Sequence, residues 1–180
     1  MTDESSPFDP SRAQARSTLR DVLHQSLAGL GGDGDYQPSI EDRIAALGFS
    51  GQAARAFDLL PLVLVAWADG SIQTDERVTI LDVLRLRGLA QGEAYTMMEM
   101  LLEEKPADVY LDTALAVLRD LLAERDVDAS SIVDLCVDVA AAAAAYVGAD
   151  PISDEEKLAI ARVADALGQV PSDDVLGLLS

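Results

Sequence analysis

The spacing of apolar residues along this chain predicts a protein built from α-helices. Apolar side chains recur every three or four positions, which places them on one face of a helix. The first such stripe consists of Leu19, Val22, Leu23, Leu27 and Leu30. No segment alternates between apolar and polar residues with period two over the length of a strand. We therefore predict an all-α fold.

Capping residues and helix breakers set the expected limits of these helices. Ser39, Thr74 and Ser153 are each placed to cap a helix at its N-terminus, and glycines follow several helix ends. Pro61 should bend its helix or mark that helix's true start. The expected helices span 11–30, 40–47, 52–68, 75–86, 91–104, 108–124, 130–147 and 154–167, with a short closing turn at 172–179.

Two distant stretches of the chain resemble each other. "VAWADGSIQTDERVTIL" begins at residue 65, and "AYVGADPISDEEKLAIA" begins at residue 145. An offset of 80 residues without a gap aligns Ile72 with Ile152 and Glu76 with Glu156. Each copy is predicted to form a helix, a short loop and a second, capped helix that ends at a glycine. Such internal similarity predicts a duplicated helical hairpin packed about an approximate two-fold axis.

Both loops lead into acidic clusters with two possible roles. Acids at a helix start are favoured by the helix dipole, and an aspartate at a loop start can hydrogen-bond its own backbone, so the motif can be a purely structural corner. Carboxylates without His or Cys also suit hard cations such as Ca²⁺ or Mg²⁺. The candidate metal ligands are Asp69, Asp75, Glu76, Asp150, Glu155 and Glu156.

The two loops do not follow the EF-hand pattern. Counting from Asp69, the sixth position is Thr74 instead of glycine and the twelfth is Ile80 instead of glutamate. In the second copy, Pro151 follows Asp150 where the first copy has an Asp-Gly pair. Any metal site at these corners would therefore be irregular, with water or a partner supplying some ligands.

The segment "AWADGSIQTDER" resembles the A-x-A-D-G-x-I-x-x-x-E hallmark of TerB-like proteins, the tellurite-resistance family, and "GADPISDEEK" is similar to a looser second copy. The resemblance implies an all-α bundle of about seven helices with internal pseudo-symmetry, spanning residues 51–180. It implies divalent-metal binding through Asp69 and Glu76, with Asp150 and Glu156 as the nearest matches in the second copy. It also implies a non-catalytic part in a cytoplasmic stress response, alongside an integral-membrane partner. Residues 1–10 are expected to form a disordered tail, and residues 11–50 a helical extension that packs on the core or recruits a partner.

Composition narrows the possible partners and the location. The formal net charge of -19 makes nucleic acid and anionic membranes unfavourable partners. The single cysteine, Cys136, excludes an internal disulfide framework and lies in an apolar helix, where we expect a packed core thiol. The acidic N-terminus does not read as a signal peptide, and the longest apolar runs are too short for a bilayer. A soluble cytoplasmic protein is expected.

Two other classes of function remain as alternatives. Paired carboxylates can act as general acid and base, but the sole histidine, His24, offers no recognisable catalytic set, so we expect no enzyme. Gly29, Gly31 and Gly34 match the spacing of the nucleotide-binding motif G-x-G-x-x-G. They follow an expected helix instead of a strand, so we do not expect nucleotide binding. The other alternative is a metal-free adaptor. Its possible anchors, for which core packing is the favoured interpretation, are Trp67, Tyr146, Met97, Met98 and Met100.

Overall fold

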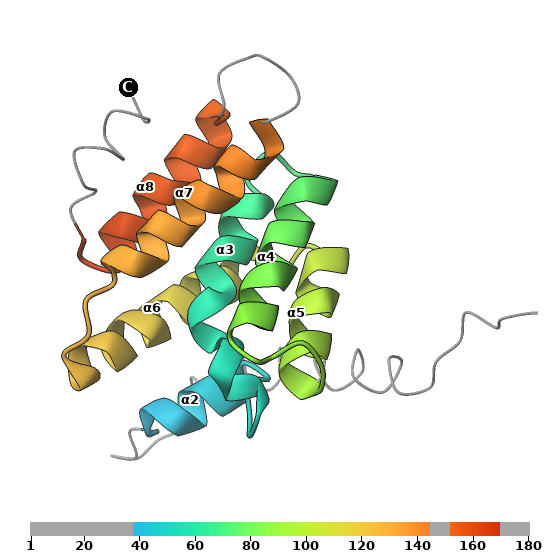
Figure 1. Cartoon of the computed structure of the whole chain (residues 1–180). Helices are drawn as coiled ribbons and strands as arrows, with labels where there is room; N and C mark the ends of the chain where they lie inside the picture. The colour runs from blue at the N-terminus through green and yellow to red at the C-terminus, as the bar shows by residue number, and fades with distance from the viewer. Residues whose placement is uncertain (1–37, 145–151, 170–180) are drawn as a thin grey trace, which may run out of the picture.

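The computed structural model describes residues 38–144 and 152–169, and these ranges contain seven α-helices and no strand (Figure 1). The prediction of an all-α fold is therefore confirmed. A 3₁₀ helix, η2, precedes α3. The elements are α2 (Ile40–Ala46), η2 (Ala53–Leu59), α3 (Leu60–Ala66), α4 (Thr74–Leu86), α5 (Glu93–Glu103), α6 (Asp108–Arg125), α7 (Ser130–Ala144) and α8 (Asp154–Ala166). The expected helix over 11–30 and the closing turn at 172–179 lie outside the described residues.

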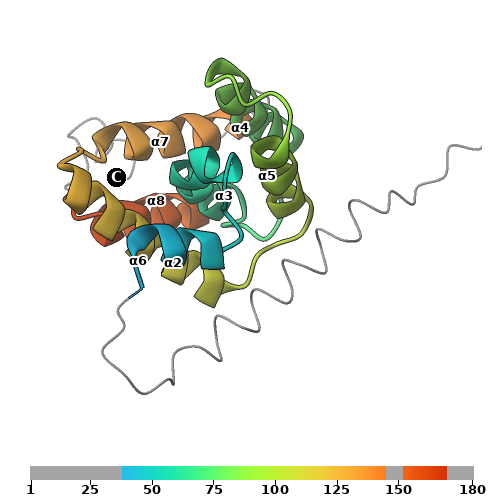
Figure 2. The same ribbon diagram turned by 90° about the horizontal axis from the view of Figure 1, so that it is seen from below.

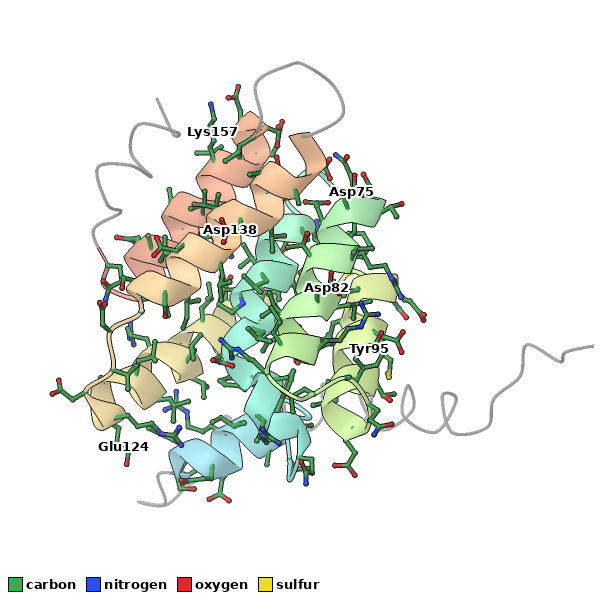
Figure 3. The ribbon with its side chains drawn as sticks, viewed as in Figure 1. Asp75, Asp82, Tyr95, Glu124, Asp138 and Lys157 are labelled. Atoms are coloured by element: carbon green, nitrogen blue, oxygen red, sulfur yellow. The ribbon has the colours of Figure 1, made fainter. Side chains whose placement is uncertain are left out.

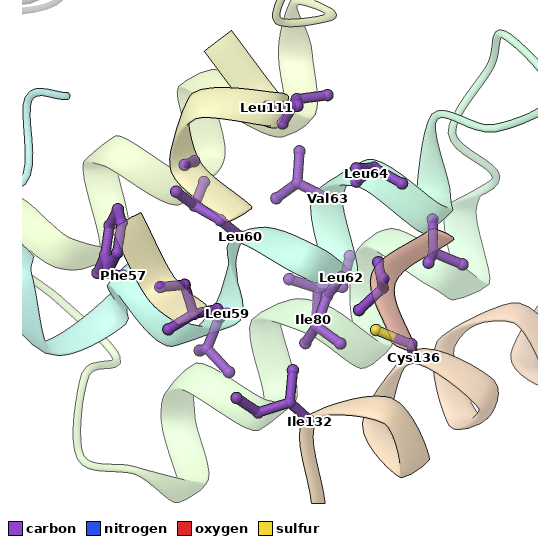
Figure 4. Close-up of a cluster of buried hydrophobic side chains, with 14 of the residues drawn as sticks. Phe57, Leu59, Leu60, Leu62, Val63, Leu64, Ile80, Leu111, Ile132 and Cys136 are labelled. Carbon is purple, nitrogen blue, oxygen red and sulfur yellow. The ribbon is translucent and has the colours of Figure 1, made fainter. Parts of the chain in front are cut away.

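Helix α3 forms the centre of the molecule. All seven of its residues are buried, and the other helices surround it (Figure 2). A helix that is apolar on every side is stable only when it is covered on every side. Leu62 and Val63 of α3 pack with Ile80 of α4 and Cys136 of α7 in one continuous core (Figure 4). None of the helices in the described ranges has the length and apolar character needed to cross a membrane.

Pro61 marks the start of a helix. The segment expected to be one helix over 52–68 divides into η2 and α3, with Pro61 in the first turn of α3. At that position proline's missing N–H removes no intrahelical hydrogen bond, and its fixed φ suits the helix. The second of the two readings of Pro61 is therefore confirmed.

The two similar sequence stretches form two helical hairpins, α3–α4 and α7–α8. Helix α3 packs against α4, α7 and α8, and α7 packs against α4 and α8. If α3 is exchanged with α7 and α4 with α8, the same pairs of helices remain in contact. This is expected for two units related by an approximate two-fold axis. Asp75 near the start of α4 and Lys157 near the start of α8 lie at the same end of the bundle (Figure 3). The starts of α4 and α8 therefore lie at one end of the protein.

Helix α2 is held along α6 by polar contacts from its middle and from its C-terminal end. The Arg43 guanidinium lies 2.8 Å from the Asp120 carboxylate, and it lowers the pKa of that carboxyl. The buried Tyr110 hydroxyl donates to the Leu47 carbonyl at 2.9 Å. Because Arg43 pairs near the end of α6 and Leu47 near its start, the two helices run in opposite directions.

Candidate functional site

The starts of α4 and α8 use the same capping arrangement. A glutamate at the third helical position accepts a hydrogen bond from the backbone N–H of the N-cap residue. The Gln73 N–H donates to Glu76 Oε2, and the Ser153 N–H donates to Glu156 Oε2, each at 2.7 Å. The Ser153 hydroxyl also accepts from the Glu156 N–H at 3.2 Å, which confirms the expected capping box. The prediction that Thr74 caps α4 is wrong, because α4 begins one residue earlier and Gln73 holds the N-cap position.

The two capping glutamates meet in the protein interior. Glu76 is 2% exposed and Glu156 is 6% exposed, and they are the only buried charged side chains in the described part of the chain. Their carboxyl groups are close enough to share a hydrogen bond. Glu76 and Glu156 hold equivalent positions in the two similar stretches, since each is the third residue of its helix and accepts the N-cap N–H.

Burial and the neighbouring acids change the protonation of Glu76. Removal from water raises the pKa of this carboxyl from 4.5 to about 8, with smaller increases from Glu156 and from the negative charge of Asp69. The hydrogen bond from the Gln73 N–H acts in the opposite direction. Near neutral pH, Glu76 therefore retains a proton that it can donate to the Glu156 carboxyl group. The proton relieves a repulsion that two adjacent buried carboxylates would otherwise suffer.

Asp69 combines a structural role with proximity to this pair. Its Oδ1 accepts from the Ser71 N–H at 2.8 Å and from the Ser71 hydroxyl at 3.4 Å, which closes the loop after α3. This is the local bond expected of an aspartate at a loop start. Asp69 is exposed, yet its charge acts on buried Glu76. The carboxyl pair therefore lies near the surface at this end of the bundle.

The remaining candidate ligands do not join the pair. Asp75 is half-buried, and its carbonyl accepts from the Thr79 hydroxyl within α4. Glu155 is exposed and lines a separate surface hollow. Asp150 lies outside the described residues. Within the described ranges, no three His, Cys, Asp or Glu side chains are arranged to hold a metal ion.

The surface hollow lies between α3, α6 and α8 and was not predicted from the sequence. It has a volume of about 280 Å³. The Trp67 indole N–H donates to the Leu101 carbonyl at 2.9 Å, so the ring is fixed beside the hollow. Leu158 stands at its edge and is 72% exposed, an unusual position for leucine that the helical spacing of α8 alone could have revealed. The lining is completed by Leu64, Ala68, Lys105, Asp108, Leu111, Glu155, Ala159 and Arg162.

Other residues considered from the sequence lie in the core. Cys136 is fully buried, and burial raises the pKa of its thiol, so it is not an activated nucleophile. Met98 and Met100 are buried and Met97 is half-buried against the core, which confirms the core-packing reading of these methionines. His24 and Tyr146 lie outside the described residues.

Comparison of the chain with protein-family models, with curated proteins and with solved structures finds no match. The similarity to TerB-like proteins therefore stays a resemblance carried by the two corner motifs.

Proposed function

We propose that this protein is a non-catalytic, TerB-like module that binds a divalent cation at the end of the bundle where its two acidic corners meet. The observation that carries the proposal is the contact between Glu76 and Glu156. Two carboxyl groups from separate hairpins approach each other in a buried place, with Asp69 near enough to act on Glu76. Such a site favours the binding of a cation, because the positive charge would relieve the repulsion between the two ionised carboxylates.

The chemistry of these donors fits a hard cation. Carboxylate oxygens are the preferred protein ligands of Ca²⁺ and Mg²⁺, and Mg²⁺ commonly binds through one or two carboxylates while retaining water. Glu76 and Glu156 would hold the ion, with Asp69 adding negative charge from the surface side. Asp150 is the sequence candidate for a further ligand from the second corner. A bound ion would supply charge neutralisation and would fasten the two hairpins together.

The cellular setting rests on the sequence resemblance. A stress-response role, a cytoplasmic location and an integral-membrane protein as partner belong to this proposal because TerB-like proteins imply them. The absence of catalysis is part of the same proposal.

Calorimetric titration of the full chain with Ca²⁺, Mg²⁺ and Mn²⁺ tests the proposal. The wild-type protein should bind at least one of these ions, and the double variant Glu76→Gln/Glu156→Gln should lose that binding. Both changes are isosteric and leave an amide oxygen able to accept the capping hydrogen bond. A matched control, Glu104→Gln/Glu124→Gln, removes the same charge from two exposed positions, after α5 and on α6, and should bind as the wild type does. Equal binding by both double variants, or no binding by the wild type, would refute the metal site and favour the metal-free adaptor.

A further inference from the structure

We propose that residues 11–30 of this chain dock as an amphipathic helix into the hollow between α3, α6 and α8, with its leucine stripe covering Trp67 and Leu158. This inference is independent of the proposed metal site, because the hollow does not include Glu76 or Glu156.

The hollow has the properties of a docking surface for apolar side chains. Its floor is formed by buried apolar residues such as Leu64 and Leu111, and the half-buried Trp67 ring adds to it. The volume of about 280 Å³ lies just below the range of about 300–1,000 Å³ that is typical of small-molecule pockets. Leu158 extends the apolar surface outward at 72% exposure. A helix that inserts aliphatic side chains into the hollow would cover all of these groups.

Residues 11–30 carry the complementary pattern. Their apolar stripe, which includes Leu19 and Leu23 at adjacent turns of the expected helix, is the kind of face that requires an apolar partner. Leu27 continues the same face one turn later. The stripe offers leucines at successive turns, and the hollow offers apolar contacts from Leu64, Trp67 and Leu158.

Charge also favours this occupant. Residues 11–30 contain Arg12, Arg16 and Arg20 against the single acid Asp21, in a chain whose formal net charge is -19. The segment is therefore positively charged while the rest of the protein is strongly negative, which favours their association.

The charged residues around the hollow also favour a positively charged occupant. Arg162 at the rim is already paired with Asp112. Within the described part of the chain, Asp108, Glu155 and Lys105 form no ion pair, so two carboxylates and one ammonium remain at the rim. An arginine-bearing helix would balance the excess negative charge.

The chain is long enough to reach the hollow. The described residues begin next to α2, whose Arg43 lies against Asp120 of α6, while Leu111 of α6 lines the hollow. Asp120 lies nine positions after Leu111 in α6, a distance of about 14 Å along the helix axis. Residues 31–37 can extend over about 25 Å. The connection is therefore longer than this separation along α6.

Limited proteolysis of the full chain with trypsin tests the docking, because trypsin cleaves after Arg16 and Arg20. Cleavage at these two sites should be at least tenfold faster in Leu158→Glu than in the wild type, as followed by mass spectrometry. Leu158 is largely exposed, so its replacement leaves the fold intact. The matched control Leu86→Glu changes a leucine that is 88% exposed on α4 and should be cleaved at the wild-type rate.

A second variant approaches the same contact from the segment. Leu23→Asp should accelerate cleavage as much as Leu158→Glu does, and combining the two changes should add nothing further. Equal cleavage rates in the wild type and in Leu158→Glu would overturn the proposal. Protection that disappears on dilution would also overturn it, because the occupant of the hollow would then be the segment of a second copy.

Discussion

Glu76 and Glu156 are 80 positions apart in the sequence, and yet their carboxyl groups lie together in the interior. Each side chain completes the start of its own helix by accepting the N-cap backbone N–H. The same two side chains also join the hairpin α3–α4 to the hairpin α7–α8. The residues that cap the two helices therefore also make a tertiary contact.

The first prediction concerns stability and pH. Unfolded Glu76 releases its proton near pH 4.5, whereas folded Glu76 keeps it up to about pH 8. The folded state thus binds more protons between these values, so the contribution of Glu76 to the free energy of unfolding is fully present below pH 4.5. That contribution falls as pH rises to about 8 and is constant above it. Glu76→Gln, which resembles the protonated form, should lose this decline and be more stable than the wild type at pH 9.

Urea denaturation at pH 5, 7 and 9 measures this effect. One pKa unit corresponds to about 1.4 kcal/mol, so the difference between variant and wild type should change by a few kcal/mol over this range. Glu124→Gln removes an exposed carboxyl on α6 and serves as the control for net charge. The same pH profile in both variants would show that Glu76 is not held in a buried carboxyl pair.

The second prediction separates the two helix caps. Ser153→Ala removes a hydroxyl that accepts the Glu156 N–H and should destabilise the protein by about 1 kcal/mol. Thr74→Ala should change stability by less than about 0.5 kcal/mol, because Thr74 is an exposed first residue of α4 and not its cap. Chemical denaturation compares the two variants. A larger loss from Thr74→Ala than from Ser153→Ala would contradict the assigned start of α4.

The third prediction addresses the central helix. Leu62 of α3 has no exposed surface, so Leu62→Ala leaves a cavity surrounded by other helices and should cost about 2–5 kcal/mol. Leu86→Ala, at an exposed position on α4, should lie within about 0.5 kcal/mol of the wild type. Thermal and urea denaturation of the pair measure the difference. Similar midpoints for both variants would mean that α3 is not enclosed.

The fourth prediction joins the proposed metal site to the raised pKa of Glu76. A divalent cation must displace the proton on this carboxyl, so binding should release protons and strengthen as pH rises from 6 to about 8. Titrations in two buffers with different ionisation enthalpies count the released protons. Affinity that is constant across this pH range would place the bound ion elsewhere on the protein.

Several features of the fold followed from short-range pattern. The spacing of apolar residues predicted helices because a helical face must match a core over successive turns. Ser39 and Ser153 were identified as caps because a serine directly before an acidic first turn is typical of an N-cap, where its hydroxyl accepts a backbone N–H. The N-cap of α4 was assigned one residue too late, because Thr74 is the stronger capping residue in isolation. The contact between Gln73 and Glu76 decided the true start.

Local patterns of residues were enough to predict the all-α class and the capped helix after each acidic corner, because these features depend on neighbours within one or two turns. The contact between Glu76 and Glu156 depends on how the hairpins pack, and the same packing leaves Asp75 half-buried and Glu155 exposed. Adjacent positions on a helix differ by about 100° in direction, so packing of the hairpins selects one acid from each corner for the interior. The hollow beside Trp67 likewise arises from three helices that are distant in sequence, and no local pattern specifies such a meeting.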